Sequence, residues 1–144
     1  MAIETIVSAL RRWATTAPDC PAYHLLGEDD RIVASLNYGR LDRQAQTIAA
    51  QISRHKLPPD ACALVMYPEG LDFITAFMGC LYAGVIAVTT PFAGDLRSAQ
   101  DAQRLQAIAA DAGAALLLDN RGRDQAVDLP IPRIITNTLP AADE

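Results

Sequence analysis

Two short segments carry ligand-binding side chains at places where the chain would leave a buried strand. The first reads Tyr-Pro-Glu-Gly over 67–70 and leads into the start of a helix, whose free backbone N–H groups can hold an anion. The second reads Thr-Thr-Pro over 89–91 and presents two hydroxyl groups. In an open parallel sheet, ligands bind beyond the carboxyl ends of the strands. The candidate pocket-lining residues are therefore Tyr67, Pro68, Glu69, Gly70, Thr89, Thr90 and Pro91.

Both segments also have a purely structural interpretation. Pro68 and Gly70 are accounted for by a turn, and the segment 67–70 lacks the glycine density of a loop that cradles phosphate. Threonines at a strand end, such as Thr89 and Thr90, are common for packing and strand propensity alone. The sequence therefore favours turn and packing roles here. It identifies no catalytic residue, no cofactor-binding residue and no metal ligand in this chain.

Other reactive residues lack the partners that their chemistry needs. Asp119 and Asn120 follow an apolar run, as the phosphoacceptor aspartate of a receiver domain does, but the only lysine, Lys56, falls in a helix-to-strand turn. His24 and His55 have no Ser, Cys or carboxylate at a spacing that indicates a catalytic pair. No GxGxxG motif follows an expected strand, so the dinucleotide-binding fingerprint is missing.

The segment 61–91 predicts the unit that would position these candidates: a strand, a helix and a second strand. An unbroken apolar run over 62–67 predicts the first buried strand. Apolar residues over 71–81 recur at helical spacing, and Gly84 stands where a left-handed C-cap would close the helix. The apolar run 85–88 predicts the second strand. Two strands joined by such a helix predict a right-handed βαβ unit with parallel strands.

Further elements flank this unit. The apolar face of a first helix comprises Ile3, Ile6, Val7, Leu10, Trp13 and Ala14. The other expected elements are an antiparallel hairpin of 22–26 and 32–37, a helix N-capped by Asn37, a helix over 98–112, and strands over 114–118 and 133–136. Ser98 and Asp101 have capping-box spacing. We predict one α/β domain over 1–144, with a mostly parallel sheet, flanking helices, a small antiparallel hairpin and a frayed tail at 138–144.

Composition narrows the class of protein. The 144 residues are 51% hydrophobic, which suits one domain, and acids and bases are mixed at a net charge of -5, without the basic block that binds nucleic acid. The odd number of cysteines, Cys20, Cys62 and Cys80, without a CxxC pair, indicates reduced and mostly buried thiols. No apolar run approaches about 20 residues, and the N-terminus has no signal-peptide pattern. We expect a cytoplasmic protein without a membrane span.

The order of several blocks resembles the N-terminal region of fatty acyl-AMP ligases. These blocks are AYHLL, SLNYGRLDRQAQTIAAQI, ALVMYPEGLDFITAFMGCLYAGVIAV and RLQAIAADAGAALLL, and the resemblance spans about residues 3 to 137. The most specific part is PEGLDFITAFMGCLYAGVIAV. The resemblance implies the N-terminal part of the adenylate-forming fold, which is shared with acyl-CoA synthetases and nonribosomal adenylation domains. One departure is TTPFAGD, which stands where the family usually carries a loop rich in proline and tyrosine.

The resemblance implies an enzymatic activity, but some of the motifs that this activity needs are absent from the chain. Such ligases join a fatty acid to ATP, release pyrophosphate, and pass the acyl group to the phosphopantetheine arm of an acyl carrier protein in lipid or polyketide assembly. ATP and Mg²⁺ are cofactors of the parent enzyme. The ATP loop ending in Pro-Lys and the lysine of the C-terminal domain have no counterpart here, and Lys56 fits neither motif. We expect this region alone to be inactive, with the remainder of the ligase as its partner.

Two alternatives remain open on the sequence. The chain could be a stand-alone truncated homologue that acts as a protein-interaction module, forming a homo-oligomer or pairing with a separate ligase chain, because sheets cut from a larger protein leave edges and apolar patches that recruit partners. It could also be a small doubly wound nucleotide-binding protein, for which calorimetry with ATP would detect saturable binding.

Overall fold

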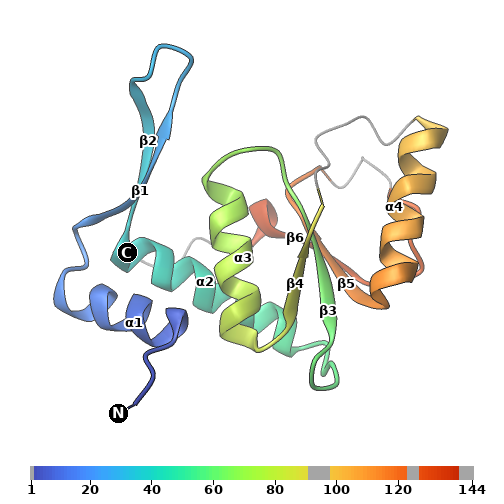
Figure 1. The fold of residues 1–144 in the computed structure, drawn as a ribbon, viewed down its shortest axis with the longest axis horizontal. Coiled ribbons are helices and arrows are strands. Elements are labelled where there is room, and N and C mark those ends of the chain that lie inside the picture. The colour runs from blue at the N-terminus through green and yellow to red at the C-terminus, as the bar shows by residue number, and fades with distance from the viewer. Residues whose placement is uncertain (1, 91–97, 123–126, 140–144) are drawn as a thin grey trace.

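The computed structural model describes residues 2–90, 98–122 and 127–139. In this part of the chain, three α-helices (α2, α3 and α4) cover a four-stranded parallel sheet, α1 packs against α2 away from the sheet, and a two-stranded antiparallel hairpin projects outward (Figure 1). The predicted α/β class, with its parallel sheet and separate hairpin, is confirmed. None of the helices in the described ranges is both long and apolar enough to cross a membrane.

The first helix, α1 (Ile6–Thr16), begins at a capping box. The backbone N–H of Ser8 donates to the Thr5 hydroxyl at 3.1 Å, and the backbone N–H of Thr5 donates to the Ser8 hydroxyl at 2.9 Å. This cap places Ile3 before the helix, so our prediction that Ile3 and Ile6 belong to its packed face is wrong. Their side chains are 92% and 64% exposed, and Leu10 is the buried residue of α1.

The hairpin consists of β1 (Pro21–Leu26) and β2 (Ile32–Asn37), close to the predicted bounds. Asn37 then caps α2 (Tyr38–Ser53), as predicted, because its side-chain oxygen accepts from the backbone N–H of Arg40 at 2.8 Å. The root of the hairpin packs on α1, α2 and α3 through the buried side chains of Leu10, Leu36, Leu41, Ala45 and Met78.

The parallel sheet has the strand order β4-β3-β5-β6. Its strands are β3 (Cys62–Met66), β4 (Ile86–Thr89), β5 (Ala114–Asp119) and β6 (Arg133–Ile135). Strands β3 and β4 pair in parallel and are joined by α3 (Leu71–Ala83), which confirms the predicted βαβ unit. Gly84 closes α3 with a φ of 74°, as its position predicted. Strand β4 starts one residue later than predicted, because the N–H of Val85 completes the helix cap by donating to the Cys80 carbonyl at 3.1 Å.

Alternate residues of the central strands face two separate cores. Helices α2 and α3 cover one face, where Ile48 and Cys80 pack on the β3 residues Ala63 and Val65. Helix α4 (Ala99–Ala112) covers the other face over Leu64, Met66 and Leu117, together with its own residues Leu105 and Ala109. Because both faces are covered, β3 and β5 read as continuous apolar runs. The sheet therefore offers its strand ends, rather than its faces, to a ligand.

Three smaller predictions need correction. The capping box of α4 is wrong: Ser98 is the N-cap residue but its side chain accepts no cap hydrogen bond, and Asp101 is one methylene shorter than the Glu or Gln that usually reaches back. The last strand ends at Ile135, since Thr136 begins a 3₁₀ turn, Thr136–Thr138. Of the cysteines, Cys80 is buried and Cys62 half-buried, but Cys20 is exposed.

Candidate functional site

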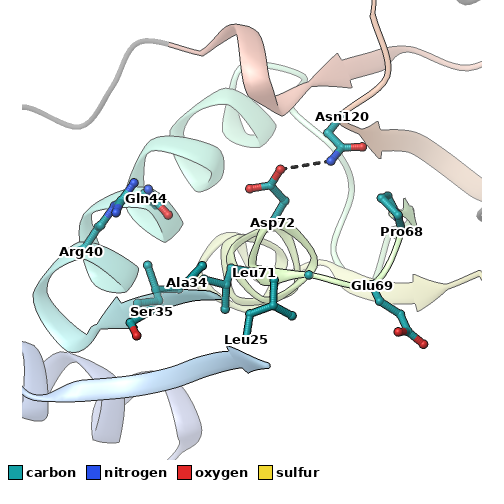
Figure 2. Close-up of a pocket in the computed structure, with 12 residues that line it drawn as sticks. Leu25, Ala34, Ser35, Arg40, Gln44, Pro68, Glu69, Leu71, Asp72 and Asn120 are labelled. Carbon is teal, nitrogen blue, oxygen red and sulfur yellow. Dashed lines mark hydrogen bonds between the residues drawn. The ribbon is translucent and has the colours of Figure 1, made fainter. Parts of the chain in front are cut away.

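An open hollow of about 370 Å³ lies between the hairpin, α2 and the turn from β3 into α3 (Figure 2). Its size is near the lower end of small-molecule pockets. The apolar part of its lining comprises Leu25, Ala34, Leu36, Pro68, Gly70 and Leu71. The polar part comprises Ser35, Arg40, Gln44, Glu69, Asp72 and Asn120. A lining that combines apolar side chains with charged groups of both signs suits an amphipathic ligand better than a bare anion.

Three of the predicted pocket residues, Pro68, Glu69 and Gly70, form one wall of this hollow. Gly70 is the N-cap residue of α3, with φ 154° and ψ -178°. This combination belongs to a region of backbone space that residues with a Cβ hardly ever adopt. A side chain at this position would meet nothing within 4 Å, so the requirement for glycine comes from the backbone and not from crowding. Gly70 thereby allows the abrupt turn from strand to helix.

The N-terminus of α3 opens beside Asp72 and Asn120. The side-chain amide of Asn120, which follows β5, donates to the Asp72 carboxylate at 3.1 Å, and Figure 2 shows the two side chains turned toward each other. Asp72 lies in the first turn of the helix, where the helix dipole stabilises a negative charge. The N-cap residue of α3, Gly70, makes no side-chain cap hydrogen bond. The Asp72–Asn120 contact ties the start of α3 to the end of β5 at the margin of the hollow.

Tyr67 is buried, and it does not line the hollow. Its hydroxyl shares a hydrogen bond of 2.8 Å with the Thr136 hydroxyl, which also donates to the Asp119 carbonyl at 3.3 Å. Burial is the main cause that raises the pKa of the Tyr67 hydroxyl far above its ordinary value, so the side chain stays neutral. Tyr67 therefore joins the end of β3 to the turn after β6.

The second predicted segment lies apart from the hollow. Thr89 is exposed at the end of β4, whereas Thr90 is buried and its hydroxyl donates to the Val65 carbonyl at 3.4 Å. Neither residue lines the hollow. Pro91 and the TTPFAGD departure beyond position 90 lie outside the described residues. Thr89 and Thr90 thus end the strand next to β3, beside Val65, without lining this hollow.

Sequence reasoning missed the opposite wall of the hollow. It comes from the hairpin and α2, with Leu25 and Ser35 on the two strands and Arg40 and Gln44 on the helix. These residues stand well before the β3–α3 turn in the chain, at ordinary strand and helix spacing. No local pattern distinguished them from surface residues. The one available signal was the guanidinium group of Arg40, whose N–H donors can bind an anion.

The described residues do not form a site for a resident metal ion. No group of three or more His, Cys, Asp or Glu side chains in residues 2–90, 98–122 and 127–139 is arranged to hold a metal. Around the hollow the carboxylates are Glu69 and Asp72, and Asp72 is engaged by Asn120. The described part of the chain therefore offers no cluster of ligands for Mg²⁺.

Comparison with known families decides the membership of the chain. The family described as AMP-binding enzyme matches residues 10–142. The chain belongs to the AMP-binding enzyme family. Its parallel sheet, its βαβ unit and the turn at Gly70 are thus the N-terminal portion of an AMP-binding enzyme, and the resemblance to the N-terminal region of fatty acyl-AMP ligases is confirmed.

Relatives of this chain include fatty acid ligases. It is 40% identical over 97 residues to a medium-chain fatty acid–acyl-carrier-protein ligase of Moorena producens, covering 67% of this chain and 16% of that protein. It is 34% identical over 117 residues to a long-chain fatty acid–AMP ligase of Mycobacterium tuberculosis, covering 79% of this chain and 19% of that protein. The chain therefore spans less than a fifth of the length of either relative.

A solved ligase structure has the same fold as this chain. The fatty acyl-adenylate ligase of L. pneumophila, in complex with acyl adenylate and pyrophosphate, superposes with a TM-score of 0.79 at 26% identity. The match covers 94% of this chain and 24% of that one. The described fold is thus shared with about a quarter of that ligase chain.

Proposed function

We propose that this chain is the N-terminal region of a fatty acyl-AMP ligase, which activates a fatty acid with ATP to an acyl-adenylate. The family match over 10–142 is the observation that carries the proposal. It is supported by relatives that are themselves ligases of fatty acids with AMP or with a carrier protein. ATP and Mg²⁺ belong to the complete enzyme, and the remainder of the ligase and an acyl carrier protein are its partners, in the cytoplasm.

The role of this region is to support the site rather than to carry out the reaction. In adenylation a carboxylate oxygen attacks the α-phosphorus and pyrophosphate leaves, so negative charge must be stabilised by cations and preorganised donors. The sequence has one lysine, Lys56, and no Pro-Lys loop. The chain, as one domain over 1–144, then forms one side of the groove between subdomains. In this proposal the turns after Tyr67 and Thr90 lie nearest the shared pocket, and the first of these turns already lines a hollow.

A chimera tests the proposal directly. Residues 10–142 would replace the matching segment of the Moorena ligase, and acyl-adenylate formation would be followed as pyrophosphate release in the presence of a medium-chain fatty acid. We expect a folded chimera with fatty-acid-dependent pyrophosphate release. The matched control carries Gly70→Ala in the same chimera, which should lower activity by straining the turn. A chimera that melts cooperatively but releases no pyrophosphate would contradict the proposal.

The inactivity of the isolated region needs a separate assay. The 144-residue chain would be incubated with fatty acid, ATP, Mg²⁺ and hydroxylamine, which traps an acyl-adenylate as the hydroxamate. We expect no hydroxamate above the level without protein. The chain lacks both the Pro-Lys loop and the lysine of the C-terminal domain, which would stabilise the negative charge of the reaction. Hydroxamate that scales with protein concentration would show that these residues are sufficient for catalysis.

A second candidate function is that of a stand-alone interaction module. Large apolar side chains are exposed on one element, the hairpin, where Leu26 (53%), Ile32 (56%) and Val33 (61%) lie close together in the chain or across the strand pair. Exposed apolar groups that gather in one place mark surfaces that bind other proteins, whereas single ones are common on any surface. A homo-oligomer, or a complex with a separate ligase chain, would cover them.

A further inference from the structure

The parallel sheet has two outer strands, β4 and β6, and they differ in how well they are protected against the addition of another strand. Strand β6 has three residues and follows Pro132, a residue that discourages strand addition. Strand β4 has the sequence Ile-Ala-Val-Thr, without a charge or a proline, and in the described part of the chain it pairs only with β3. Uncharged edges without proline are templates for another strand. The β4 edge is thus the more open side of the sheet.

The hydrogen bonds to β3 determine which backbone groups of β4 face outward. The N–H of Ile86 donates to the Ala61 carbonyl at 2.8 Å, and the N–H of Thr90 donates to the Val65 carbonyl at 3.2 Å. Backbone groups alternate in direction along a strand, so Ile86 and Thr90 face β3 while Ala87 and Thr89 face away. The outer edge therefore presents the N–H and C=O groups of Ala87 and Thr89, with Val88 between them.

This arrangement is self-complementary. In an antiparallel pair, two opposed residues exchange both of their N–H···O bonds, and the next opposed pair exchanges none. A two-fold axis at Val88 would place Ala87 of each copy opposite Thr89 of the other, which satisfies all of these outward groups in both strands. Val88 would then face Val88 of the second copy across a non-hydrogen-bonded position, with the partly exposed Ile86 nearby on the same face.

We propose that β4 is a self-association edge, at which a second copy of this chain adds its own β4 in antiparallel orientation. The partner is a second copy because its edge supplies the complementary number and spacing of donors and acceptors, and because the strand has no charge that would repel its twin. The product is one sheet that continues through both copies. This inference deepens the interaction-module function, and its failure leaves the proposed ligase function untouched.

Cysteine cross-linking tests the register. In a Cys20→Ser background, Val88→Cys places two thiols across a non-hydrogen-bonded pair, where the Cα atoms are about 4.5 Å apart and a disulfide fits. The matched control is Thr89→Cys, which is more exposed but lies opposite Ala87 of the other copy. We expect mild oxidation to give a disulfide-linked dimer with Val88→Cys and little with Thr89→Cys, and peptide mapping would locate the bond. Equal cross-linking of both variants, or none with Val88→Cys, overturns the proposal.

Sedimentation of the untagged chain over a range of concentrations tests the association itself. We expect a monomer–dimer equilibrium that Thr89→Pro weakens by about tenfold or more, because it removes an outward N–H from the seam of each copy. Val33→Lys, at an exposed apolar position of the hairpin, is the control and should leave the equilibrium unchanged. Circular dichroism would verify folding of each variant. A chain that stays monomeric throughout, or a dimer weakened by Val33→Lys alone, contradicts the proposal.

Discussion

Arg133 binds the carboxylate of Asp119 with two hydrogen bonds, from Nε to Oδ2 at 2.7 Å and from Nη2 to Oδ1 at 2.9 Å. Asp119 is the last residue of β5 and is fully buried, and Arg133 is the first residue of β6. The same carboxylate accepts from the backbone N–H of Arg121 at 2.9 Å. The pair therefore links two neighbouring strands at the carboxyl edge of the sheet, next to the Tyr67–Thr136 hydrogen bond.

Removing one member of this pair should be costly. Arg133→Met would leave the buried Asp119 carboxylate without its cation, and broken buried pairs of this kind lose about 3–5 kcal/mol of unfolding free energy. Urea unfolding followed by circular dichroism measures the loss. The control is the double variant Asp119→Leu with Arg133→Met, which removes both charges and should be closer to the parent in stability. A single variant as stable as the parent would show that the pair contributes nothing.

Gly79 allows α2 and α3 to approach closely. A Cβ at this position would lie 2.5 Å from Cγ2 and 2.7 Å from Cβ of Ile48. Helix propensity alone would favour alanine by about 1 kcal/mol, but overpacking of this kind costs about 1–3 kcal/mol. We expect Gly79→Ala to lower the denaturant midpoint.

A double-mutant cycle separates this clash from other effects. In an Ile48→Gly background both obstructing atoms, Cβ and Cγ2, are removed, so Gly79→Ala should be much less destabilising there. In an Ile48→Val background Cβ and Cγ2 remain, and the destabilisation should persist. Equal effects of Gly79→Ala in all three backgrounds would mean that the contact with Ile48 is not its cause.

The two glycines that flank α3 should respond differently to alanine. A Cβ added at either position would have no neighbouring atom within 4 Å, so the cost comes from the backbone alone. Gly84 has φ 74°, a left-handed conformation in which alanine costs about 1–2 kcal/mol. Gly70 has φ 154° and ψ -178°, which only glycine populates, and we expect Gly70→Ala to cost about 2–3 kcal/mol. Thermal unfolding of the two variants would contradict this if Gly84→Ala were the less stable.

The buried thiol of Cys80 should make the fold sensitive to alkali. Burial raises its pKa from 9.0 to about 12. Below pH 9 the thiol is protonated in both states, so its contribution to stability is fully present. Above pH 9 the unfolded chain loses this proton while the folded chain keeps it, and stability falls by up to about 1.4 kcal/mol per pH unit until the folded thiol also ionises.

Urea midpoints measured on both sides of pH 9 test this dependence, with Cys80→Ala as the variant that lacks the group. The slope of stability against pH should be smaller in Cys80→Ala, and the remaining slope reflects buried hydroxyls such as that of Tyr67, whose pKa is also raised by burial. Alkylation of the native protein gives an independent readout, since exposed Cys20 should react long before Cys80. Early modification of Cys80 would contradict its burial.

Local patterns in the sequence were sufficient to predict the features that depend on residues close together in the chain. Asn37 caps α2 and Gly84 caps α3, because a cap needs only a side chain or a left-handed residue within one turn. The βαβ unit followed from apolar runs separated by a helical period, since covering both faces of a parallel sheet requires such runs. The candidate wall at Pro68, Glu69 and Gly70 came from the same local reasoning.

Tertiary structure alone decided how distant residues combine. The hollow joins the β3–α3 turn to Leu25 and Arg40, which lie far earlier in the chain, and Asp119 reaches Arg133 only because β5 and β6 pair in a particular register. Propensity and periodicity act within a few residues, whereas such contacts depend on which faces pack and how strands align. The sequence therefore determined the elements and the family, and packing determined which of their side chains meet.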